Sequence, residues 1–208
     1  MTFEIIGMVV VAYLLGSIPS GLWIGQIFYH KDIRKLGSGN IGTTNTFRVL
    51  GAKAGIVVLL LDILKGTLAA SQPYMLGVSH SVNPLLIGIF ASLGHTFSIF
   101  DHFHGGKAVA TSAGILLAYN PPLFIVACII FVSMIALTSM VSCASIVGIT
   151  SIFIIALCDH DLILGTVAGA LTLLVIWRHK SNIKRIFQGT ESMVNFGLGH
   201  YLRTKKEH

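Results

Sequence analysis

The polar segment Gly37–Arg48 contains the residue types of an anion-binding loop. It reads Gly-Ser-Gly-Asn-Ile-Gly-Thr-Thr-Asn-Thr-Phe-Arg and lies between two long apolar stretches. Glycines allow backbone N–H groups to approach an anion, while hydroxyl, amide and guanidinium groups supply further donors. The first six residues match Gly-x-Gly-x-x-Gly, but no strand is predicted before them, so we do not expect a dinucleotide site.

Two further polar clusters carry similar donors. One combines Gly94-His95 with residues 101–111, where Gly105-Gly106-Lys107 precedes an apolar segment, and the other spans 178–191. Backbone N–H groups at a helix start and a nearby ammonium group favour phosphate. The glycine pair lacks the spacing of a P-loop, so ATP binding is not expected. The clusters indicate more than one phosphate, or a phosphate that moves.

The composition predicts a membrane protein. Hydrophobic residues make up 54% of the chain, charged residues 11%, and the mean hydropathy is +0.82, whereas a soluble domain carries about 25% charged residues. In lipid only helices or closed barrels satisfy the backbone, and these apolar runs are too long for barrel strands. We therefore predict a single all-α integral membrane domain over residues 1–208, with about seven transmembrane helices. The expected segments are 3–29, 54–74, 84–100, 108–119, 122–138, 145–158 and 162–177, of which the fourth and sixth are short.

Basic residues predict the orientation of these segments. Of the 14 Lys and Arg residues, all except Lys65 fall in 30–53, in 101–107 or after residue 177. Seven spans put these three regions on one face of the membrane. Because basic loops remain in the cytoplasm, we expect the N-terminus outside, the C-terminus in the cytoplasm and the polar clusters on the cytoplasmic face.

Asp62 and Lys65 stand three residues apart on one face of an apolar segment. A charge within the membrane costs at least about 2.5–3.5 kcal/mol on insertion scales, so such residues are usually functional or neutralise each other. A structural ion pair and a contact with the functional site are both compatible with this spacing.

The order of these motifs resembles the bacterial acyl-phosphate:glycerol-3-phosphate acyltransferases of the PlsY type. The resemblance begins at Tyr13–Gly21, includes Asp62–Gly66 and continues through all three polar clusters. It implies a multi-pass enzyme of the bacterial inner membrane that transfers a fatty acyl group from acyl phosphate to glycerol 3-phosphate. The products are 1-acylglycerol 3-phosphate (lysophosphatidic acid) and phosphate, in the first step of phospholipid biosynthesis. A soluble enzyme that forms acyl phosphate is implied upstream; no cofactor, metal or nucleic acid is expected.

The resemblance also implies the site residues. Those with catalytic roles would be Ser38, Lys107, Ser142, His179 and Asn182, and those that bind substrate would be Gly39, Asn40, Thr44, Asn45, Arg48, Gly105 and Gly106. Lys107 and Arg48 would bind phosphate, and Ser38 and Ser142 would form hydrogen bonds around the acyl phosphate. His179 and Asn182 would orient glycerol 3-phosphate. The proton acceptor is either His179 or a phosphate of the substrate.

Departures from the family pattern keep a second interpretation open. Where the family usually has Ala, Pro, Lys, Gly and Arg-Tyr, this chain has Thr43, Ser98, His104, Ala108 and Ser139-Met140 respectively. A divergent copy with weak or altered activity would fit these changes. A transporter or flippase of an organic phosphate is the alternative from another class, although the sequence has no inverted repeat of the kind that carriers often contain.

Overall fold

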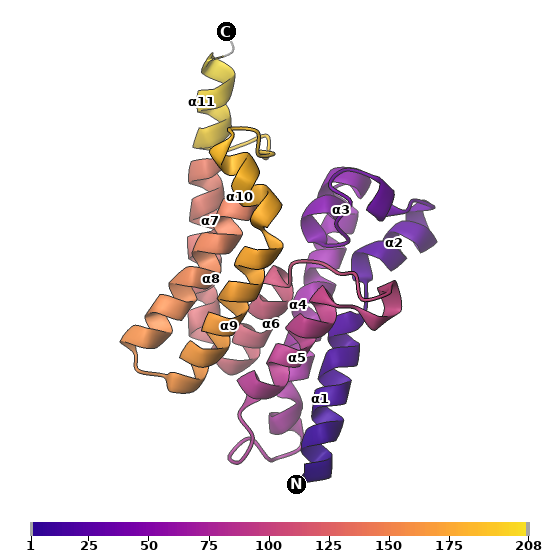
Figure 1. The fold of residues 1–208 in the computed structure, drawn as a ribbon, viewed down its shortest axis with the longest axis vertical. Helices are drawn as coiled ribbons and strands as arrows, with labels where there is room; N and C mark the ends of the chain where they lie inside the picture. Colours follow the sequence, from indigo (N-terminus) through magenta and orange to yellow (C-terminus); the bar gives the residue numbers. More distant parts are fainter. Residues whose placement is uncertain (1, 207–208) are drawn as a thin grey trace. The chain divides into compact units, whose positions relative to one another are not determined.

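A computed structural model describes residues 2–206 and, over that range, contains helices and no strand. The chain divides into two compact units, Met1–Pro121 and Pro122–His208, whose elements are labelled in Figure 1. The orientation prediction concerns the two ends of the chain. Of these ends, residues 1, 207 and 208 lie outside the described residues. The prediction of one domain over residues 1–208 stays a prediction.

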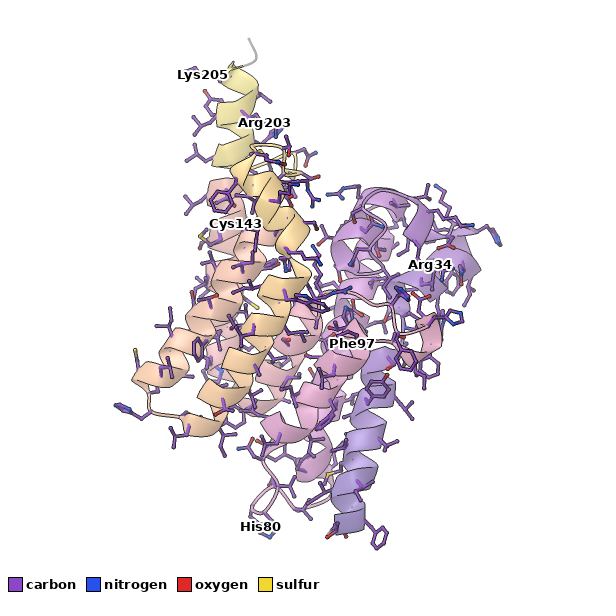
Figure 2. The ribbon with its side chains drawn as sticks, viewed as in Figure 1. Arg34, His80, Phe97, Cys143, Arg203 and Lys205 are labelled. Carbon is purple, nitrogen blue, oxygen red and sulfur yellow. The ribbon has the colours of Figure 1, made fainter. Side chains whose placement is uncertain are left out.

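Unit 1 is built around the helix α4. Its elements are α1 (Thr2–Ser17), α2 (Ser20–Tyr29), the 3-10 turn η1 (Ile33–Lys35), α3 (Thr43–Leu50), α4 (Ala52–Met75), α5 (Pro84–Thr96), the 3-10 turn η2 (Ile99–Asp101) and α6 (Val109–Tyr119). Helices α1, α2, α3, α5 and α6 all contact α4. Arg34 and His80 lie at opposite ends of this unit (Figure 2), and the polar loops gather at the end that contains Arg34.

The first predicted span is a broken helix. Residues 3–29 were expected to form one segment, but the chain bends by 43° between α1 and α2, where Pro19 lacks a backbone N–H group. The break frees backbone carbonyl groups, which need partners in an apolar environment. Lys65 donates to the Ile18 carbonyl at 3.0 Å, and Ser98 Oγ donates to the carbonyl of Ser17. Side chains from α4 and from the residue just before η2 therefore stabilise the bend.

Small residues allow the helices of unit 1 to pack closely. The Cα of Gly66 in α4 lies against the Thr111 carbonyl of α6, and Gly114 in α6 lies against the Ile63 carbonyl of α4, so neither position has room for a Cβ atom. Gly16 brings α1 against α5 in the same way. Such contacts are typical of helix pairs in membranes, where close backbone approach provides much of the attraction.

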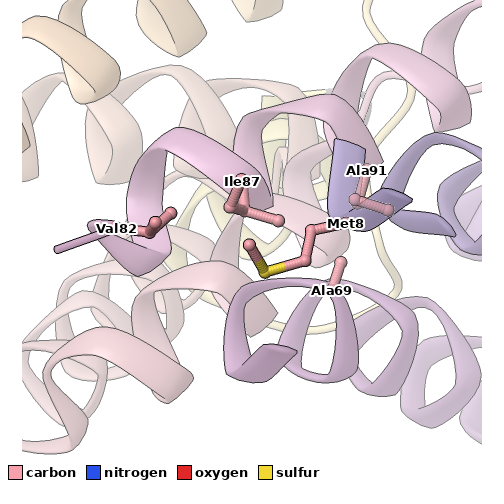
Figure 3. Close-up of a cluster of buried hydrophobic side chains, with 6 residues drawn as sticks. Met8, Ala69, Val82, Ile87 and Ala91 are labelled. Atoms are coloured by element: carbon pink, nitrogen blue, oxygen red, sulfur yellow. The ribbon is translucent and has the colours of Figure 1, made fainter. Parts of the chain in front are cut away.

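The apolar part of unit 1 packs around α1, α4 and α5. Met8 and Ala12 from α1 contact Ala69 from α4, together with Ile87 and Ala91 from α5 (Figure 3). This cluster lies toward the N-terminal part of α1, away from the break between α1 and α2. It fixes the helices whose other ends carry the polar loops.

Unit 2 contains α7 (Pro121–Thr138), α8 (Val141–Cys158), α9 (Leu162–Arg178), α10 (Lys180–Phe187) and α11 (Leu198–Lys206). Helices α8 and α9 form a hairpin, and α9 and α10 meet at a bend of 62°. The predicted segment 145–158 was too short: α8 begins at Val141. Ser142, which lies outside the predicted segment, is therefore in the first turn of a helix.

Four helical segments among the described residues are long and apolar enough to cross a membrane, and counting each bent pair as one span raises this number to six. α4 is about 36 Å long at 1.5 Å per residue, which exceeds the roughly 30 Å hydrocarbon thickness of a bilayer. α6 is apolar but has only 11 residues. Large apolar side chains such as Leu60, Val132 and Leu173 are 60%, 63% and 72% exposed, as expected for surfaces that face lipid.

The turn between α8 and α9 gives a stability prediction. His160 has φ 55° and is exposed, and the following residue, Asp161, donates its N–H group to the Ala156 carbonyl at 3.1 Å. This left-handed position after a helix favours glycine. His160→Gly should raise the free energy of unfolding by about 0.5–1 kcal/mol, seen as a rise of a few degrees in Tm in detergent. His160→Ala retains the unfavourable φ, and an equal rise in that variant would contradict this explanation.

Candidate active site

The Asn45 side chain holds the Gly37–Arg48 loop in its conformation through hydrogen bonds to the backbone. Its side chain is 2% exposed. The Oδ1 atom accepts from the Ser38 N–H group at 2.8 Å, and Nδ2 donates to the carbonyls of Ile33 and Leu36 at 3.0 and 3.1 Å. Both atoms of this amide thus bond to backbone groups, in the loop and in the chain just before it. Asn45 was predicted to bind substrate, which stays a prediction; in the structure its amide holds the loop to the chain that precedes it.

Other predicted residues of this loop face outward. Ser38, Thr44 and Arg48 are exposed, and Asn40 and Gly39 are half-buried. Asn40 accepts from the Gly42 N–H group at 2.9 Å, which turns the chain into α3. The loop therefore presents two hydroxyl groups and one guanidinium group on a frame that Asn40 and Asn45 hold.

Arg34, in the turn η1 just before this loop, connects η1 to the segment that contains η2. It donates to both carboxylate oxygens of Asp32 at 2.9 and 2.8 Å, and to Oδ1 of Asp101 at 2.6 Å. The side-chain hydrogen bond from Arg34 lowers the pKa of Asp32 from 3.8 to about 2, although partial burial acts against it. Asp101 is 4% exposed, and its Oδ2 atom has no hydrogen-bond partner within the described residues. A single guanidinium group thus fixes η1 relative to η2.

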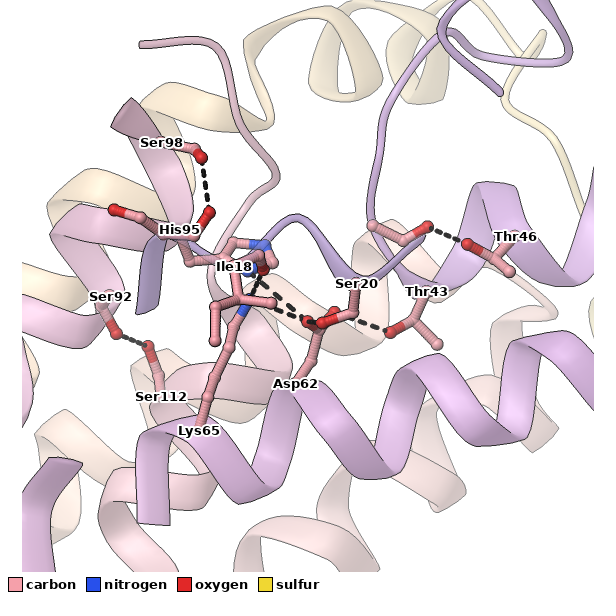
Figure 4. A network of polar contacts seen from close by, with 12 residues as sticks. Ile18, Ser20, Thr43, Thr46, Asp62, Lys65, Ser92, His95, Ser98 and Ser112 are labelled. Atoms are coloured by element: carbon pink, nitrogen blue, oxygen red, sulfur yellow. Dashed lines mark hydrogen bonds and ion pairs between the residues drawn. The ribbon is translucent and has the colours of Figure 1, made fainter. Parts of the chain in front are cut away.

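Asp62 collects donors from several segments of unit 1 (Figure 4). Its Oδ1 atom lies 2.9 Å from Lys65 Nζ and 3.2 Å from Ser20 Oγ, and Oδ2 accepts from Thr43 Oγ1 at 3.3 Å. His95 Nδ1 lies 3.8 Å from Oδ1. Asp62 and Lys65 are 2% and 5% exposed. Of the two interpretations of this pair, the structure establishes the ion pair.

The segment Gly105–Lys107 rests on the end of α5. Gly105 lies against the carbonyls of His95 and Thr96, and Gly106 lies against the His95 imidazole, with no room for a Cβ atom. The Gly106 N–H group donates to the His95 carbonyl at 3.0 Å. That N–H group is therefore paired with a backbone carbonyl, and the predicted anion-binding role of this segment stays a prediction. Lys107 is half-buried and lies two residues before α6.

Glu191 is the centre of the polar cluster in unit 2. It is 4% exposed, and its Oε1 atom accepts from Ser142 Oγ at 2.8 Å and from Asn182 Nδ2 at 2.6 Å, while Oε2 pairs with Arg185 Nε at 2.8 Å. Burial acts to raise the pKa of Glu191, but the hydrogen bonds from Asn182, Ser142 and Arg185 outweigh it and hold the pKa below its ordinary value of 4.5. The structure brings Ser142 and Asn182 together, as the predicted site requires, through a carboxylate.

His179 lies at the bend between α9 and α10. It is 2% exposed, and its Nδ1 atom is 2.8 Å from the Val175 carbonyl. A carbonyl only accepts hydrogen bonds, so Nδ1 carries the proton and Nε2 is the basic nitrogen of the neutral ring. The residue therefore has the tautomer that a base acting through Nε2 needs.

The chain matches the family model for glycerol-3-phosphate acyltransferase over residues 6–189. It belongs to this family. A glycerol-3-phosphate acyltransferase of Limosilactobacillus reuteri (strain DSM 20016) is 74% identical over 207 residues, which cover 100% of this chain and 99% of the relative. The enzyme of the same name from Levilactobacillus brevis is 55% identical over 206 residues, covering 98% and 100% of the two chains.

Two solved structures are similar along most of the chain. One is the crystal structure of PlsY, an integral membrane glycerol 3-phosphate acyltransferase, in its glycerol 3-phosphate form. It has a TM-score of 0.86 at 34% identity, and the match covers 91% of this chain and 95% of PlsY. The lysophosphatidic acid form of PlsY has a TM-score of 0.83 at 33% identity, covering 91% and 94%. The chain is thus an all-helical member of a family with a solved integral membrane representative.

Several residues that depart from the family pattern make hydrogen bonds or adopt a positive φ in this structure. Thr43 and Ser98 add hydroxyl groups that donate to Asp62 and to the carbonyl of Ser17. Ala108 has φ 57°, a left-handed conformation that glycine adopts at no cost. Ser139 also has a positive φ, and its Oγ atom accepts from the His200 N–H group at 2.9 Å.

Sequence reasoning assigned no role to Glu191 or to Arg34. Glu191 is the one acidic residue between Asp161 and Glu207, within a strongly basic segment, and this isolation was the available signal. Nothing local connects Arg34 to Asp101, because they are 67 positions apart. Within residues 2–206, no group of three or more His, Cys, Asp or Glu side chains could hold a metal ion.

The Glu191 cluster predicts an acid-sensitive contribution to stability. Because the pKa of Glu191 is lower in the folded protein, its stabilisation is complete above the unfolded pKa and disappears as pH falls through the folded value. Glu191→Gln should cost about 2 kcal/mol or more at pH 7, since hydrogen bonds to a charged group are lost. The Tm difference between wild type and variant should shrink as pH falls below about 4.5.

The exposed carboxylate Asp159 provides the matched control, because it lies in the same unit outside this cluster. Asp159→Asn should leave Tm nearly unchanged at pH 7. If the two variants lose stability equally, or if the Glu191→Gln difference is constant with pH, the carboxylate is not what holds the cluster.

Proposed function

We propose that this chain transfers a fatty acyl group from acyl phosphate to glycerol 3-phosphate, forming 1-acylglycerol 3-phosphate and inorganic phosphate. The observation that carries the proposal is the family match over residues 6–189. The PlsY structures in glycerol 3-phosphate and lysophosphatidic acid forms support the acceptor and the product. The acyl phosphate donor follows from the motif resemblance, and we propose a soluble enzyme that forms it upstream.

This reaction needs positioning more than it needs a protein nucleophile. The acceptor hydroxyl oxygen forms an ester bond to the acyl carbon, the bond from that carbon to the phosphate oxygen breaks, and the hydroxyl proton passes to a base. Phosphate is already a good leaving group. Holding two anionic substrates and stabilising the charge that develops can therefore provide most of the acceleration.

In unit 1, we assign phosphate binding to Arg48 and Lys107 and hydrogen bonding to Ser38 and Thr44. Three of these side chains, Ser38, Thr44 and Arg48, are exposed on the rigid loop frame. Arg48 offers a planar set of donors that matches a phosphate, while Lys107 acts as a more compact charge. The glycines of both loops stay assigned to the substrate-binding region, and Gly106 contributes by close packing rather than through its N–H group.

In unit 2, we assign Ser142, His179 and Asn182 to the same reaction. Ser142 donates its single proton to Glu191, so while that bond holds, Ser142 can only accept from another group. Asn182 uses one N–H of Nδ2 for Glu191, which fixes the plane of its amide. Glu191 thereby decides how both side chains are oriented toward glycerol 3-phosphate.

Two groups can take the proton of the acceptor hydroxyl. His179 Nε2 is basic in the tautomer described above. A phosphate oxygen of a bound substrate can take the proton instead, which makes catalysis substrate-assisted. The transfer remains balanced in both cases, since each route releases the proton with the phosphate product or to solvent.

We further propose seven membrane crossings in a bacterial cytoplasmic membrane, with the active site on the cytoplasmic face. The seven apolar segments of the sequence fall on the pair α1–α2, on α4, on α5 with η2, and singly on α6, α7, α8 and α9. α6 is the short one, about 16 Å at 1.5 Å per residue. The positive-inside rule then supports a cytoplasmic location for Arg34, Arg48 and Lys107.

Reporter fusions test this topology. A fusion after residue 206 should report the cytoplasm, and an insertion in the turn between α8 and α9 at Asp159 should report the exterior. A fusion in the turn after α4, near Gly77, is expected outside as well. If the fusions after residue 206 and at Asp159 report the same side, the number of crossings is wrong.

The family match also bears on the two alternatives. A transporter of an organic phosphate has lost its support, because the matching family and the solved relative are acyltransferases. A divergent copy with altered activity remains testable. Its departures, such as Thr43 and Ser98, lie in the framework beneath the loops.

A turnover assay tests the proposed function. Purified protein supplied with acyl phosphate and labelled glycerol 3-phosphate should release one phosphate for each lysophosphatidic acid formed. Lys107→Ala should reduce turnover at least about 100-fold, because it removes a charge that stabilises the transition state. Its Tm in detergent should stay close to that of wild type, because Lys107 is not part of the apolar packing.

Lys205→Ala is the matched control, since Lys205 is an exposed lysine in α11. It should leave the rate unchanged. Wild-type protein that forms no lysophosphatidic acid would refute the enzyme proposal for this chain, and normal turnover in Lys107→Ala would refute the phosphate role of that residue.

A further inference from the structure

The Asp62 carboxylate has more partners than an ion pair alone requires. Lys65 neutralises its charge, and Ser20 adds a hydrogen bond from α2. The contact with Thr43 is different in kind, because Thr43 is the first residue of α3. α3 is the part of the polar loop that carries Thr44 and Arg48.

The start of α3 has few other attachments through side chains. Gly42 precedes the helix and provides no side-chain cap. Thr46 donates back to the Gly42 carbonyl within the same helix, and Asn45 holds the helix to the chain that precedes it. The hydrogen bond from Thr43 to Asp62 therefore connects the first turn of α3 to the buried face of α4.

The segment Gly105–Lys107 is connected to the same carboxylate through the His95 side chain. The imidazole lies 3.8 Å from Asp62 Oδ1 on one side and against the backbone of Gly106 on the other. Lys107 is the next residue. Asp62 is thus in contact with Thr43 on one loop and, through one ring, with the segment that carries the predicted lysine.

We propose that Asp62 is a positioning residue for glycerol 3-phosphate binding, acting through Thr43 on α3 and through His95 on Gly105–Lys107. Lys65 keeps the carboxylate charged in an apolar environment and is itself fixed by the Ile18 carbonyl. This inference rests on the proposed function for the identity of the ligand. It assigns Thr43, in particular, the task of holding Thr44 and Arg48 in register with Lys107.

A merely structural ion pair makes a different prediction. Asp62→Ala is uninformative by itself, because it leaves Lys65 buried without a counter-charge and such changes commonly prevent folding. Thr43→Val avoids this problem, since it preserves shape and removes one neutral donor. Ser20→Ala removes another neutral donor from the same carboxylate, at 3.2 Å compared with 3.3 Å for Thr43, but Ser20 belongs to α2, which carries no assigned substrate residue.

The test compares these two variants by steady-state kinetics and by binding. Thr43→Val should raise the KM for glycerol 3-phosphate about three- to tenfold, the range expected for one lost hydrogen bond. The kcat and the KM for acyl phosphate should stay within a factor of two of wild type. Ser20→Ala should lower Tm by a similar amount but leave all three kinetic constants unchanged. Thr43→Ser keeps the hydroxyl and should restore the wild-type KM.

Equal KM values in Thr43→Val and wild type would overturn the positioning role, and so would an equal KM increase in Ser20→Ala. Calorimetric titration of detergent-solubilised protein with glycerol 3-phosphate separates this result from failure of the proposed function. If wild type binds glycerol 3-phosphate without turnover, a weaker affinity in Thr43→Val still supports positioning, while the transfer reaction is refuted. Absence of binding to wild type overturns both.

Discussion

Burial of a charged pair is the constraint on which unit 1 depends. Asp62 and Lys65 are almost fully buried in a largely apolar helix, so each must be paired and hydrogen-bonded to be tolerated. The groups that pair with these two charges are themselves polar groups that require hydrogen-bond partners. The Ile18 carbonyl needs a donor because the helix breaks there, and Lys65 provides it. The hydroxyls of Ser20 and Thr43 need acceptors, and Asp62 provides both. The bend, the start of α3 and the charge pair therefore depend on one another.

In each unit a buried carboxylate gathers several polar side chains, Asp62 in unit 1 and Glu191 in unit 2. Glu191 resembles Asp62 in collecting two neutral donors and one cation. It differs in its position, since it follows α10 and pairs with a partly exposed arginine rather than a buried lysine. A carboxylate suits this task because it has two oxygens with several acceptor positions and can hold donors from segments that are distant in sequence. Such centres set the donors in place without adding positive charge.

The sequence was sufficient for the parts of the fold that depend on hydropathy. The seven apolar segments all correspond to helices, because burial in lipid follows from side-chain polarity averaged over many residues. The start of α8 was missed, since Ser142 and Ser145 look like a polar break although each hydroxyl finds a partner within the unit. Substrate binding by Asn45 and Gly106 stays a prediction, and the hydrogen bonds that these residues make within the protein were not readable from the sequence. Composition shows that a donor or acceptor is present, but the fold decides whether another group of the protein already pairs with it.

Within the Gly37–Arg48 loop, some polar residues are buried and hold the loop in place, while others are exposed. Along α3, Asn45 and Thr46 are buried while Thr44 and Arg48 are exposed. Adjacent polar residues therefore differ in whether they face the protein or the surface. Inward residues determine where the helix lies, and outward residues determine what it can bind. Changes at Asn45 should therefore act mainly on stability and those at Arg48 mainly on affinity for an anion. Thr43, at the boundary between the two sets, is the position at which framework and binding surface meet, because its one hydroxyl joins the loop to the buried charge.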